Sequence, residues 1–204
     1  MIQKKTGRPR AFDKDQVLQA AIKVFWEKGY DGASMKDLTL AMGINGPSLY
    51  AVFGDKKKLY LEAIDRYSKD DGCAPLVAFE SEPDIEKAVI AFMKASIDYS
   101  GNSQDGPNGC FLGSCVPITA GLVDGVTERL QQAIIGTDER LAMRFEQEKK
   151  QGTLPADFPS LQRSRLMFDL RQGHVLRARA ELDSSTAMTD LAFRAKIVFA
   201  SNDC

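Results

Sequence analysis

The sequence predicts an all-α fold in two parts, an N-terminal three-helix module over residues 1–66 and a larger helical body over residues 67–204. Apolar residues recur at helical spacing, as Met35, Leu38 and Met42 do. Breaks rich in Gly, Pro and Asp separate these runs, and no segment shows the alternation of a half-buried strand. No internal repeat or low-complexity tract is present, so helices alone are expected.

The start of segment 33–59 predicts a short helix that ends in a tight turn. Ser34 can cap this helix with its hydroxyl, and Asp37 completes a short variant of the capping box three positions later. Gly43 follows the last apolar residue of the helix. A glycine there can take a positive φ and turn the chain sharply.

The same segment continues into a second short helix. Asn45 or Gly46 can cap it, and Pro47 fits its first turn, where a missing N–H costs nothing. Its expected inward face consists of Leu49, Val52 and Phe53, and its outward face of Ser48, Tyr50 and Ala51. Two short helices joined by a glycine turn form a helix-turn-helix pattern.

This pattern indicates contact with double-stranded DNA. The small residues Gly46, Pro47, Ser48 and Ala51 would let the second helix approach the floor of the major groove, while flanking groups hold the phosphates. Tyr50 can donate its phenol to a phosphate, and Lys56 opens the next helix beside the same backbone. The alternative is an ordinary helical hairpin with a half-buried tyrosine.

The residues before this segment are basic. Asp13 can cap a first helix that Gly29 closes, and the cations ahead of it are Lys4, Lys5, Arg8 and Arg10. Such an arm can follow the phosphates or enter the minor groove, or it can be a solvated terminus. Residues 1–60 hold 11 Lys and Arg against 6 Asp and Glu, a net charge of +5, whereas the rest holds 16 against 22, a net of −6. A basic module on an acidic body favours a nucleic-acid partner.

Three stretches together resemble the DNA-binding domain of the tetracycline-repressor (TetR/AcrR) family: Gly-Arg-Pro-Arg-Ala-Phe-Asp, Ala-Ala-Ile-Lys-Val-Phe-Trp-Glu-Lys-Gly-Tyr and Met-Gly-Ile-Asn-Gly-Pro-Ser-Leu-Tyr-Ala-Val-Phe-Gly-Asp-Lys. The resemblance covers about residues 8–66. It implies phosphate contacts from Ser34, Tyr50 and Lys56 and base reading by residues 45–51. The expected DNA-binding set is Lys5, Arg8, Arg10, Ser34, Asn45, Gly46, Pro47, Ser48, Tyr50 and Lys56. Gly46 and Ala51 are smaller than the residues that many relatives carry there, so few side chains would reach bases.

The remaining chain is consistent with the ligand-binding and dimerisation half of that family. Its periodicity predicts helices over 56–69, 74–80, 84–100, 109–116, 122–150, 160–181 and 185–200. The sequence contains no run of about 20 apolar residues and no apolar core of a signal peptide at its start. We therefore expect a cytoplasmic protein.

The resemblance implies a homodimer in which the last two helices of each subunit form a four-helix bundle. A two-fold dimer also suits a palindromic operator. The interface is expected at Leu166, Leu170, Val175, Leu191 and Val198. The alternative is that these residues form only intramolecular core.

A small-molecule effector is the usual trigger of the family. A mixture of aromatic residues and methionine with few polar groups suits an apolar ligand. The candidate lining is Phe92, Ser96, Tyr99, Cys110, Phe111, Phe145, Met167 and His174. Taken one by one, these residues are better explained as plain core than as ligand contacts, and His174 as a satisfied interior or interface group.

The four cysteines, Cys73, Cys110, Cys115 and Cys204, lack the paired spacing of a zinc site. Cys110 follows Gly-Pro-Asn-Gly and is expected at a helix N-terminus, where the dipole favours a thiolate. Some members of the resembled family carry a Gly-Cys here that senses oxidants or electrophiles, while many carry one without such a role. A bridge to Cys115 would require the helix to distort, and buried, inert thiols are favoured over a thiol switch, which stays the alternative.

The sequence therefore predicts a dimeric, sequence-specific DNA-binding regulator, a repressor that a small apolar ligand releases from its operator. The alternatives are a repressor that senses oxidants or electrophiles through Cys110 and a nucleoid-type binder without an effector. No nucleophile–base set, phosphate loop or metal spacing favours an enzyme. No cofactor or metal is expected.

Overall fold

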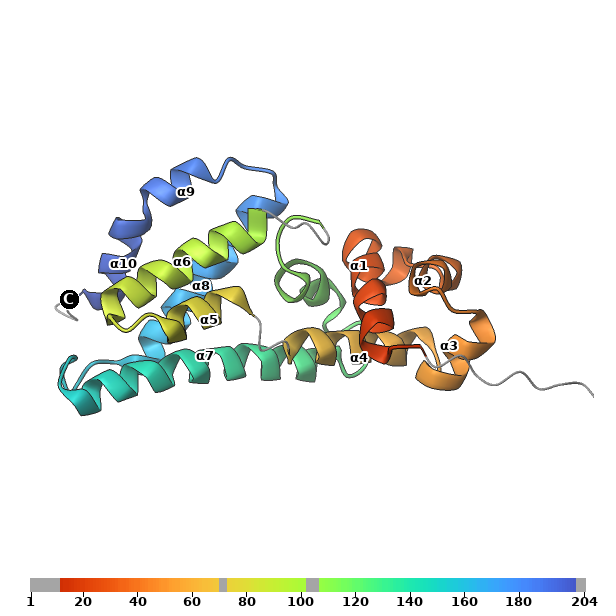
Figure 1. The fold of residues 1–204 in the computed structure, drawn as a ribbon, viewed down its shortest axis with the longest axis horizontal. Helices are drawn as coiled ribbons and strands as arrows, with labels where there is room; N and C mark the ends of the chain where they lie inside the picture. The colour runs from red at the N-terminus through yellow and green to blue at the C-terminus, as the bar shows by residue number, and fades with distance from the viewer. Residues whose placement is uncertain (1–11, 70–72, 102–106, 201–204) are drawn as a thin grey trace, which may run out of the picture.

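The structure is a computed structural model that describes residues 12–69, 73–101 and 107–200. In these ranges every regular element is helical, which confirms the all-α prediction. Figure 1 shows an elongated molecule with α1–α3 at one end and α5–α10 at the other. The N-terminal elements are α1 (Lys14–Gly32), α2 (Met35–Met42), α3 (Gly46–Phe53) and α4 (Lys56–Ser68). The later elements are α5 (Ala74–Ser81), α6 (Ile85–Gly101), η1 (Phe111–Cys115), η2 (Val116–Thr119), α7 (Val126–Gln151), α8 (Ser160–Arg179), α9 (Ser185–Thr189) and α10 (Leu191–Phe199).

The first helix starts as predicted but ends later. The Asp13 carboxylate accepts from the backbone N–H of Asp15 at 2.9 Å and so caps α1. Gly29 has a φ of 72°, which kinks the helix without ending it, and the helix continues to Gly32. The glycine therefore turns the chain, as expected, but does not close the element.

Three expected helices of the body differ in the structure. The predicted helix over 109–116 is a π-helical segment, η1, followed by the 3-10 turn η2, in which Pro117 lies at the start. The next helix begins at Val126 instead of 122, because Gly121 and Gly125 both have positive φ values and form a turn. The last predicted helix is divided at Asp190 into α9 and α10, without a glycine or proline to signal the break.

Two hydrophobic cores hold the molecule together. The first contains the buried faces of α1–α4, with Phe25, Leu38 and Leu49 fully buried, and it continues into η1 through Phe111. The second lies among α5, α6, α7, α8 and α10, with Phe79 and Phe145 at its centre. Burial of such side chains contributes on the order of 2 kcal/mol each, so both ends have a substantial core of their own.

Helix α4 joins the two ends. Its inward face belongs to the first core, and its C-terminal turn reaches the body (Figure 1). The Tyr60 hydroxyl lies 3.0 Å from the Thr119 hydroxyl, and Asp65 pairs with Arg129 of α7 at 2.8 Å. A displacement of α4 must therefore disturb contacts with the body. No helix within the described ranges is long and apolar enough to cross a membrane.

Candidate nucleic-acid interface and cavities of the body

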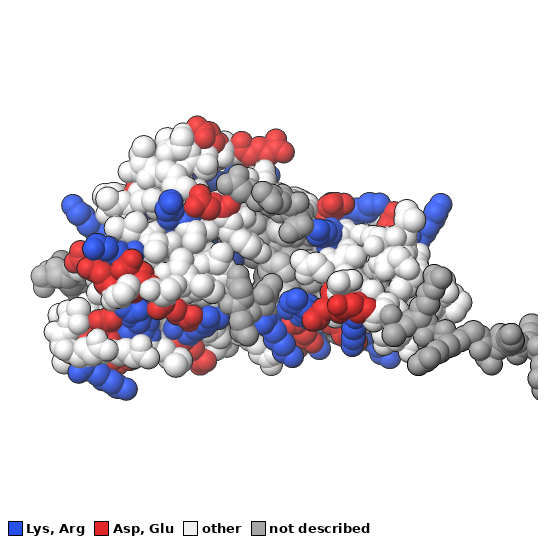
Figure 2. Space-filling view, viewed as in Figure 1, with Lys and Arg blue, Asp and Glu red and all other residues white. Residues whose placement is uncertain are grey.

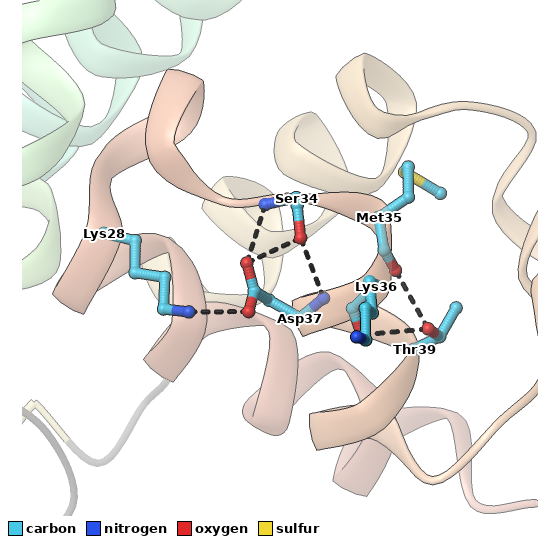
Figure 3. A network of polar contacts seen from close by, with 6 residues as sticks. All are labelled: Lys28, Ser34, Met35, Lys36, Asp37 and Thr39. Atoms are coloured by element: carbon cyan, nitrogen blue, oxygen red, sulfur yellow. Dashed lines mark hydrogen bonds and ion pairs between the residues drawn. The ribbon is translucent and has the colours of Figure 1, made fainter.

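The start of α2 is fixed by a network of polar contacts (Figure 3). The Ser34 hydroxyl accepts from the backbone N–H of Asp37 at 3.1 Å, and the Asp37 carboxylate accepts from the backbone N–H of Ser34 at 3.1 Å. This confirms the predicted capping box. Lys28 of α1 donates to the other Asp37 oxygen at 2.6 Å. The bonds from Lys28 and Ser34 hold the pKa of Asp37 well below its usual range, so the carboxylate is charged and ties α2 to α1.

The turn after α2 adopts the predicted glycine conformation. Gly43 has a φ of 64°, and its N–H donates to carbonyls at the end of α2. Thr39 donates its hydroxyl to the Met35 carbonyl at 2.9 Å (Figure 3), which satisfies a side chain that could otherwise compete with the helix. This geometry sets the direction in which α3 leaves α2.

Helix α3 presents one face to the core and another to solvent. Asn45 caps it by accepting from the Ser48 N–H at 2.8 Å, which selects between the two predicted caps. Leu49 and Phe53 are buried, one helical turn apart, while Tyr50 is 54% exposed. The prediction that Val52 faces inward is wrong. Of the three residues predicted to face inward, only Leu49 and Phe53 meet the core, and Val52 is 43% exposed.

Lys56 lies beside this face at the start of α4. Its ammonium is 4.6 Å from the centroid of the Tyr30 ring and 3.4 Å from the Asp31 carbonyl oxygen. These contacts hold the charge near the end of α1 and reduce the freedom of a long side chain. Ser34 and Asn45, by contrast, use their side-chain oxygens as caps, and their backbone carbonyls accept from Leu38 and Leu49.

The folded part of the module carries little excess charge. Residues 12–60 contain seven Lys and Arg and six Asp and Glu, so four of the five excess positive charges come from Lys4, Lys5, Arg8 and Arg10. Those four residues, including the predicted contacts Lys5, Arg8 and Arg10, lie outside the described residues. On the face drawn in Figure 2, positive and negative side chains are interspersed over both ends of the molecule.

The body contains a cavity of about 270 Å³ that extends from α6 to α8 and reaches the end of α4. Of the predicted ligand residues, the structure places Phe92, Tyr99 and Cys110 in its wall. The other apolar lining residues are Leu76, Leu112, Pro117, Leu130, Ala133, Ile134 and Phe168. Of the remaining predicted residues, Ser96 donates to the Phe92 carbonyl within α6, Phe111 lies in the first core, and Phe145 and Met167 lie in the second.

A polar cluster in the cavity wall joins three helices and the residue before η1. The Tyr67 hydroxyl of α4 lies 2.7 Å from the Tyr99 hydroxyl of α6 and 3.5 Å from the Cys110 sulfur. From α8, the Arg171 guanidinium donates to the Cys110 sulfur at 3.4 Å and to the Gln172 amide oxygen at 3.3 Å. Tyr67, Arg171 and Gln172 were not expected here, because they lie far from Cys110 in sequence and carry no local motif.

Cys110 has an unusual environment for a buried thiol. Burial alone would raise the pKa of the Cys110 thiol. The Arg171 guanidinium and the Tyr67 hydroxyl together lower this pKa by more than burial raises it, so the net shift is downward. Cys110 directly precedes η1, which agrees with the expected start of a helical element, although the charge that favours its thiolate comes mainly from Arg171. Cys115 instead donates its S–H to the Phe25 carbonyl at 3.2 Å, and burial raises its pKa. Both thiols are free.

A second, larger cavity of about 790 Å³ lies between the end of α8 and helices α9 and α10. His174, predicted as a ligand residue, lines this cavity and is nearly fully buried. Its Nε2 atom lies 3.2 Å from Nη1 of Arg194, which can only donate, so Nε2 accepts. Burial and the nearby charges of Arg194 and Arg177 lower the pKa of His174 to about 4.

The residues predicted for the dimer interface lie at different depths. Val175 and Val198 are buried inside the subunit, with 1% and 0% exposed. Leu166, Leu170 and Leu191 are half-buried against the second core. The exposed apolar side chains on the same helices are Leu161, Leu176 and Phe193. Among the residues that the structure describes, no group of three His, Cys, Asp or Glu side chains could hold a metal ion.

Comparison with known proteins finds similarity to one family of bacterial regulators. The family model described as "Bacterial regulatory proteins, tetR family" matches residues 17–63, which include α2 and α3. The transcriptional repressor ComR of Escherichia coli (strain K12) is 39% identical over 113 residues, covering 54% of this chain and 53% of ComR. The repressor BdcR of the same strain is 33% identical over 107 residues, covering 52% of this chain and 53% of BdcR. The matches thus span about half the length of these curated relatives.

Solved structures extend the similarity over most of the fold. A cysteine mutant of the TetR family transcriptional regulator CifR, complexed with 26 bp double-strand operator DNA, superposes with a TM-score of 0.80. It is 26% identical in sequence, and the match covers 93% of this chain and 98% of CifR. A TetR transcriptional regulator from Chloroflexus aurantiacus J-10-FL, 19% identical with a TM-score of 0.74, shares the fold.

Proposed function

Since the chain belongs to the tetR family of bacterial regulatory proteins, we propose that it is a DNA-binding transcriptional repressor. The observation that carries the proposal is the α2–turn–α3 unit, in which the caps at Ser34 and Asn45 and the Gly43 turn present α3 to solvent. Two sequence relatives are named transcriptional repressors, and a structural relative is complexed with operator DNA. A regulator of transcription works where the chromosome is, so the proposal places the protein in the cytoplasm.

In this proposal, residues 1–66 form the DNA-binding domain and residues 67–204 the regulatory body. Residues 45–51 face base edges in the major groove, Tyr50 and Lys56 hold phosphates, and the basic arm supplies most of the excess positive charge. The amides at the start of α2, beside Ser34, complete the phosphate contacts. Because the exposed side chains of α3 are short, phosphate contacts supply much of the affinity.

The repressor would act as a homodimer. A palindromic operator presents two half-sites about one DNA turn apart, which a two-fold dimer matches. On α8 and α10, the exposed side chains of Leu161, Leu176 and Phe193 are available for the contact between subunits, together with the half-buried Leu166, Leu170 and Leu191. Val175 and Val198 would support that surface from the interior.

Release from the operator would follow ligand binding in the 270 Å³ cavity. Tyr67, in the last turn of α4, is in the cavity wall and also packs edge-on against Trp26 of α1, with ring centroids 6.2 Å apart. A ligand that displaces Tyr67 therefore acts on the helix that carries the DNA-binding module. It shifts the equilibrium only as far as it prefers the displaced state. Among the described residues that line the 790 Å³ cavity, none belongs to α4.

A second candidate function is a thiol-based switch at Cys110. The observation that favours it is the contact between the Cys110 sulfur and the Arg171 guanidinium, which stabilises the reactive thiolate. Modification of the sulfur by an oxidant or electrophile would alter the contacts of Tyr67 in the same wall. Under this candidate, Cys110→Ser abolishes release of DNA by oxidants or reactive aldehydes. Unchanged release in Cys110→Ser would exclude it.

Selection of bound sequences from random DNA tests the proposed function. We expect an enriched inverted repeat, and sedimentation of the free protein should show a dimer. Enrichment of no sequence, with binding that depends on salt alone, would indicate a nucleoid-type binder instead. Compounds are then screened for release of the selected operator.

A further inference from the structure

We propose that the 270 Å³ cavity binds a small organic acid, whose apolar body lies among the aliphatic and aromatic side chains and whose carboxylate pairs with Arg171. The inference names the chemical class of the effector and so rests on the proposed ligand-controlled function of this cavity. It differs from the sequence-based expectation of a purely apolar ligand in requiring one negative charge.

The first argument is that several arginines of the body pair with a carboxylate, whereas Arg171, within the described part of the chain, does not. Arg129 pairs with Asp65, Arg144 with Glu148 and Arg194 with Asp190. In the same cavity wall, Arg140 forms a two-pronged pair with Glu80 through Nε–Oε1 and Nη2–Oε2 contacts. Within residues 12–69, 73–101 and 107–200, Arg171 forms no ion pair with a carboxylate.

The second argument is what Arg171 contacts instead. Its two hydrogen bonds go to the neutral Gln172 amide and to the Cys110 sulfur. A guanidinium that is half-buried in an apolar wall needs an anionic partner, and its planar donors match the two oxygens of a carboxylate better than a single sulfur. A thiolate offers one soft, weakly accepting atom, so a bound carboxylate would be the better partner.

The third argument is the shape and composition of the rest of the cavity. Its volume is near the lower end of the ligand cavities found in proteins, about 300 Å³, which limits the ligand to a small body. Phe92, Leu112, Ile134 and Phe168 supply the apolar wall. Tyr67 and Tyr99 place hydroxyls near the Arg171 end, where they can donate to the same anion.

The pairing also gives a way for an acid to move α4. An anion beside Arg171 would compete with the Cys110 sulfur and attract the Tyr67 hydroxyl away from Tyr99. Tyr67 belongs to α4, so the contact with the ligand is transmitted to the helix that carries the DNA-binding module.

The test uses two probes of the same size, 2-naphthoate and 2-naphthamide, titrated into the full-length protein by calorimetry without DNA. We expect the wild type to bind the acid at least about tenfold more tightly than the amide, since a charge-assisted contact is worth more than a neutral one. Arg171→Met should remove this preference, and Arg171→Lys should retain part of it. Arg165→Gln is the matched control, because Arg165 is on the same helix, is 60% exposed and pairs weakly with Asp138 at 3.8 Å.

A second measurement is the rate at which the Cys110 thiol is alkylated. Bound 2-naphthoate should slow alkylation of Cys110 by iodoacetamide, because the acid replaces the thiolate beside Arg171, while 2-naphthamide should slow it less. Equal binding of the two probes by the wild type, an unchanged preference in a folded Arg171→Met, or no binding of either probe would overturn the inference. If the acid binds through Arg171 but does not change operator affinity, the inference stands and the proposed release mechanism fails.

Discussion

The Tyr67 hydroxyl lies 2.7 Å from the Tyr99 hydroxyl, so the last turn of α4 is hydrogen-bonded to α6 inside the body. Burial raises the pKa of both phenols, so each hydroxyl keeps its proton at neutral pH. The same Tyr67 ring packs against Trp26 of α1 and Phe111 of η1. Tyr67 therefore links the wall of the cavity to the N-terminal module.

A double-mutant cycle tests this bond. Tyr67→Phe and Tyr99→Phe should each lower the free energy of unfolding by about 1 kcal/mol, because each leaves the other hydroxyl with one partner fewer. The double variant should lose clearly less free energy of unfolding than the sum of the two single losses, since both single changes remove the same hydrogen bond. Urea unfolding measures all four proteins. Strict additivity would show that the two hydroxyls do not interact in solution.

Loss of a phosphate contact should weaken binding to every DNA sequence by the same factor. Tyr50→Phe and Lys56→Ala are expected to reduce affinity for the operator and for scrambled DNA by the same factor. Lys56→Ala should also reduce the steepness with which the logarithm of the binding constant falls with the logarithm of salt concentration. The expected reduction is about 0.9, the value for one phosphate contact. Lys149→Ala, at the far end of α7, is the control. A changed base preference with intact affinity would contradict the phosphate assignment.

Gly46 offers a way to alter what α3 reads. A Cβ at Gly46 would meet nothing within 4 Å, so a side chain there has space and points away from the core. Gly46→Arg should therefore change stability by no more than about 0.5 kcal/mol and should change the sequence enriched from random DNA. Thermal melting and a second selection measure the two effects. An identical enriched sequence would mean that this position does not approach base edges.

The buried His174 should make stability depend on pH. Its pKa is lowered to about 4, against about 6.5 in an unfolded chain. Between these values the unfolded chain binds a proton that the folded protein does not. The free energy of unfolding should therefore fall by up to roughly 3 kcal/mol as pH drops from about 6.5 to 4. Above pH 6.5, His174 should cause no change of this free energy with pH.

His174→Gln keeps an acceptor for Arg194 but cannot titrate, so it serves as the comparison for this effect. Urea unfolding of both proteins from pH 4.5 to 7.5 should give a difference that grows toward low pH. Parallel curves would show that His174 titrates alike in the folded and unfolded states.

The two ends of the chain differ in how much the sequence could predict. The cap at Ser34 and the turn at Gly43 depend on residues within a few positions, so local patterns were enough to place them, and they narrowed the cap of α3 to Asn45 or Gly46. The cavity cluster joins Tyr67, Cys110 and Arg171, and the last two are 61 positions apart. Such contacts arise from helix packing, which periodicity does not encode. Val52 was misplaced for a related reason: a two-turn helix can bury only one narrow stripe.

The central claim is that α3, held by α2 and flanked by phosphate contacts, distinguishes one DNA sequence from others. The most direct measurement is the dissociation constant for the selected operator and for its scrambled version, at one fixed physiological salt concentration. We predict that the operator binds at least about a thousandfold more tightly, the lower range for specific regulators. Equal dissociation constants would contradict the claim and leave only sequence-independent binding to DNA.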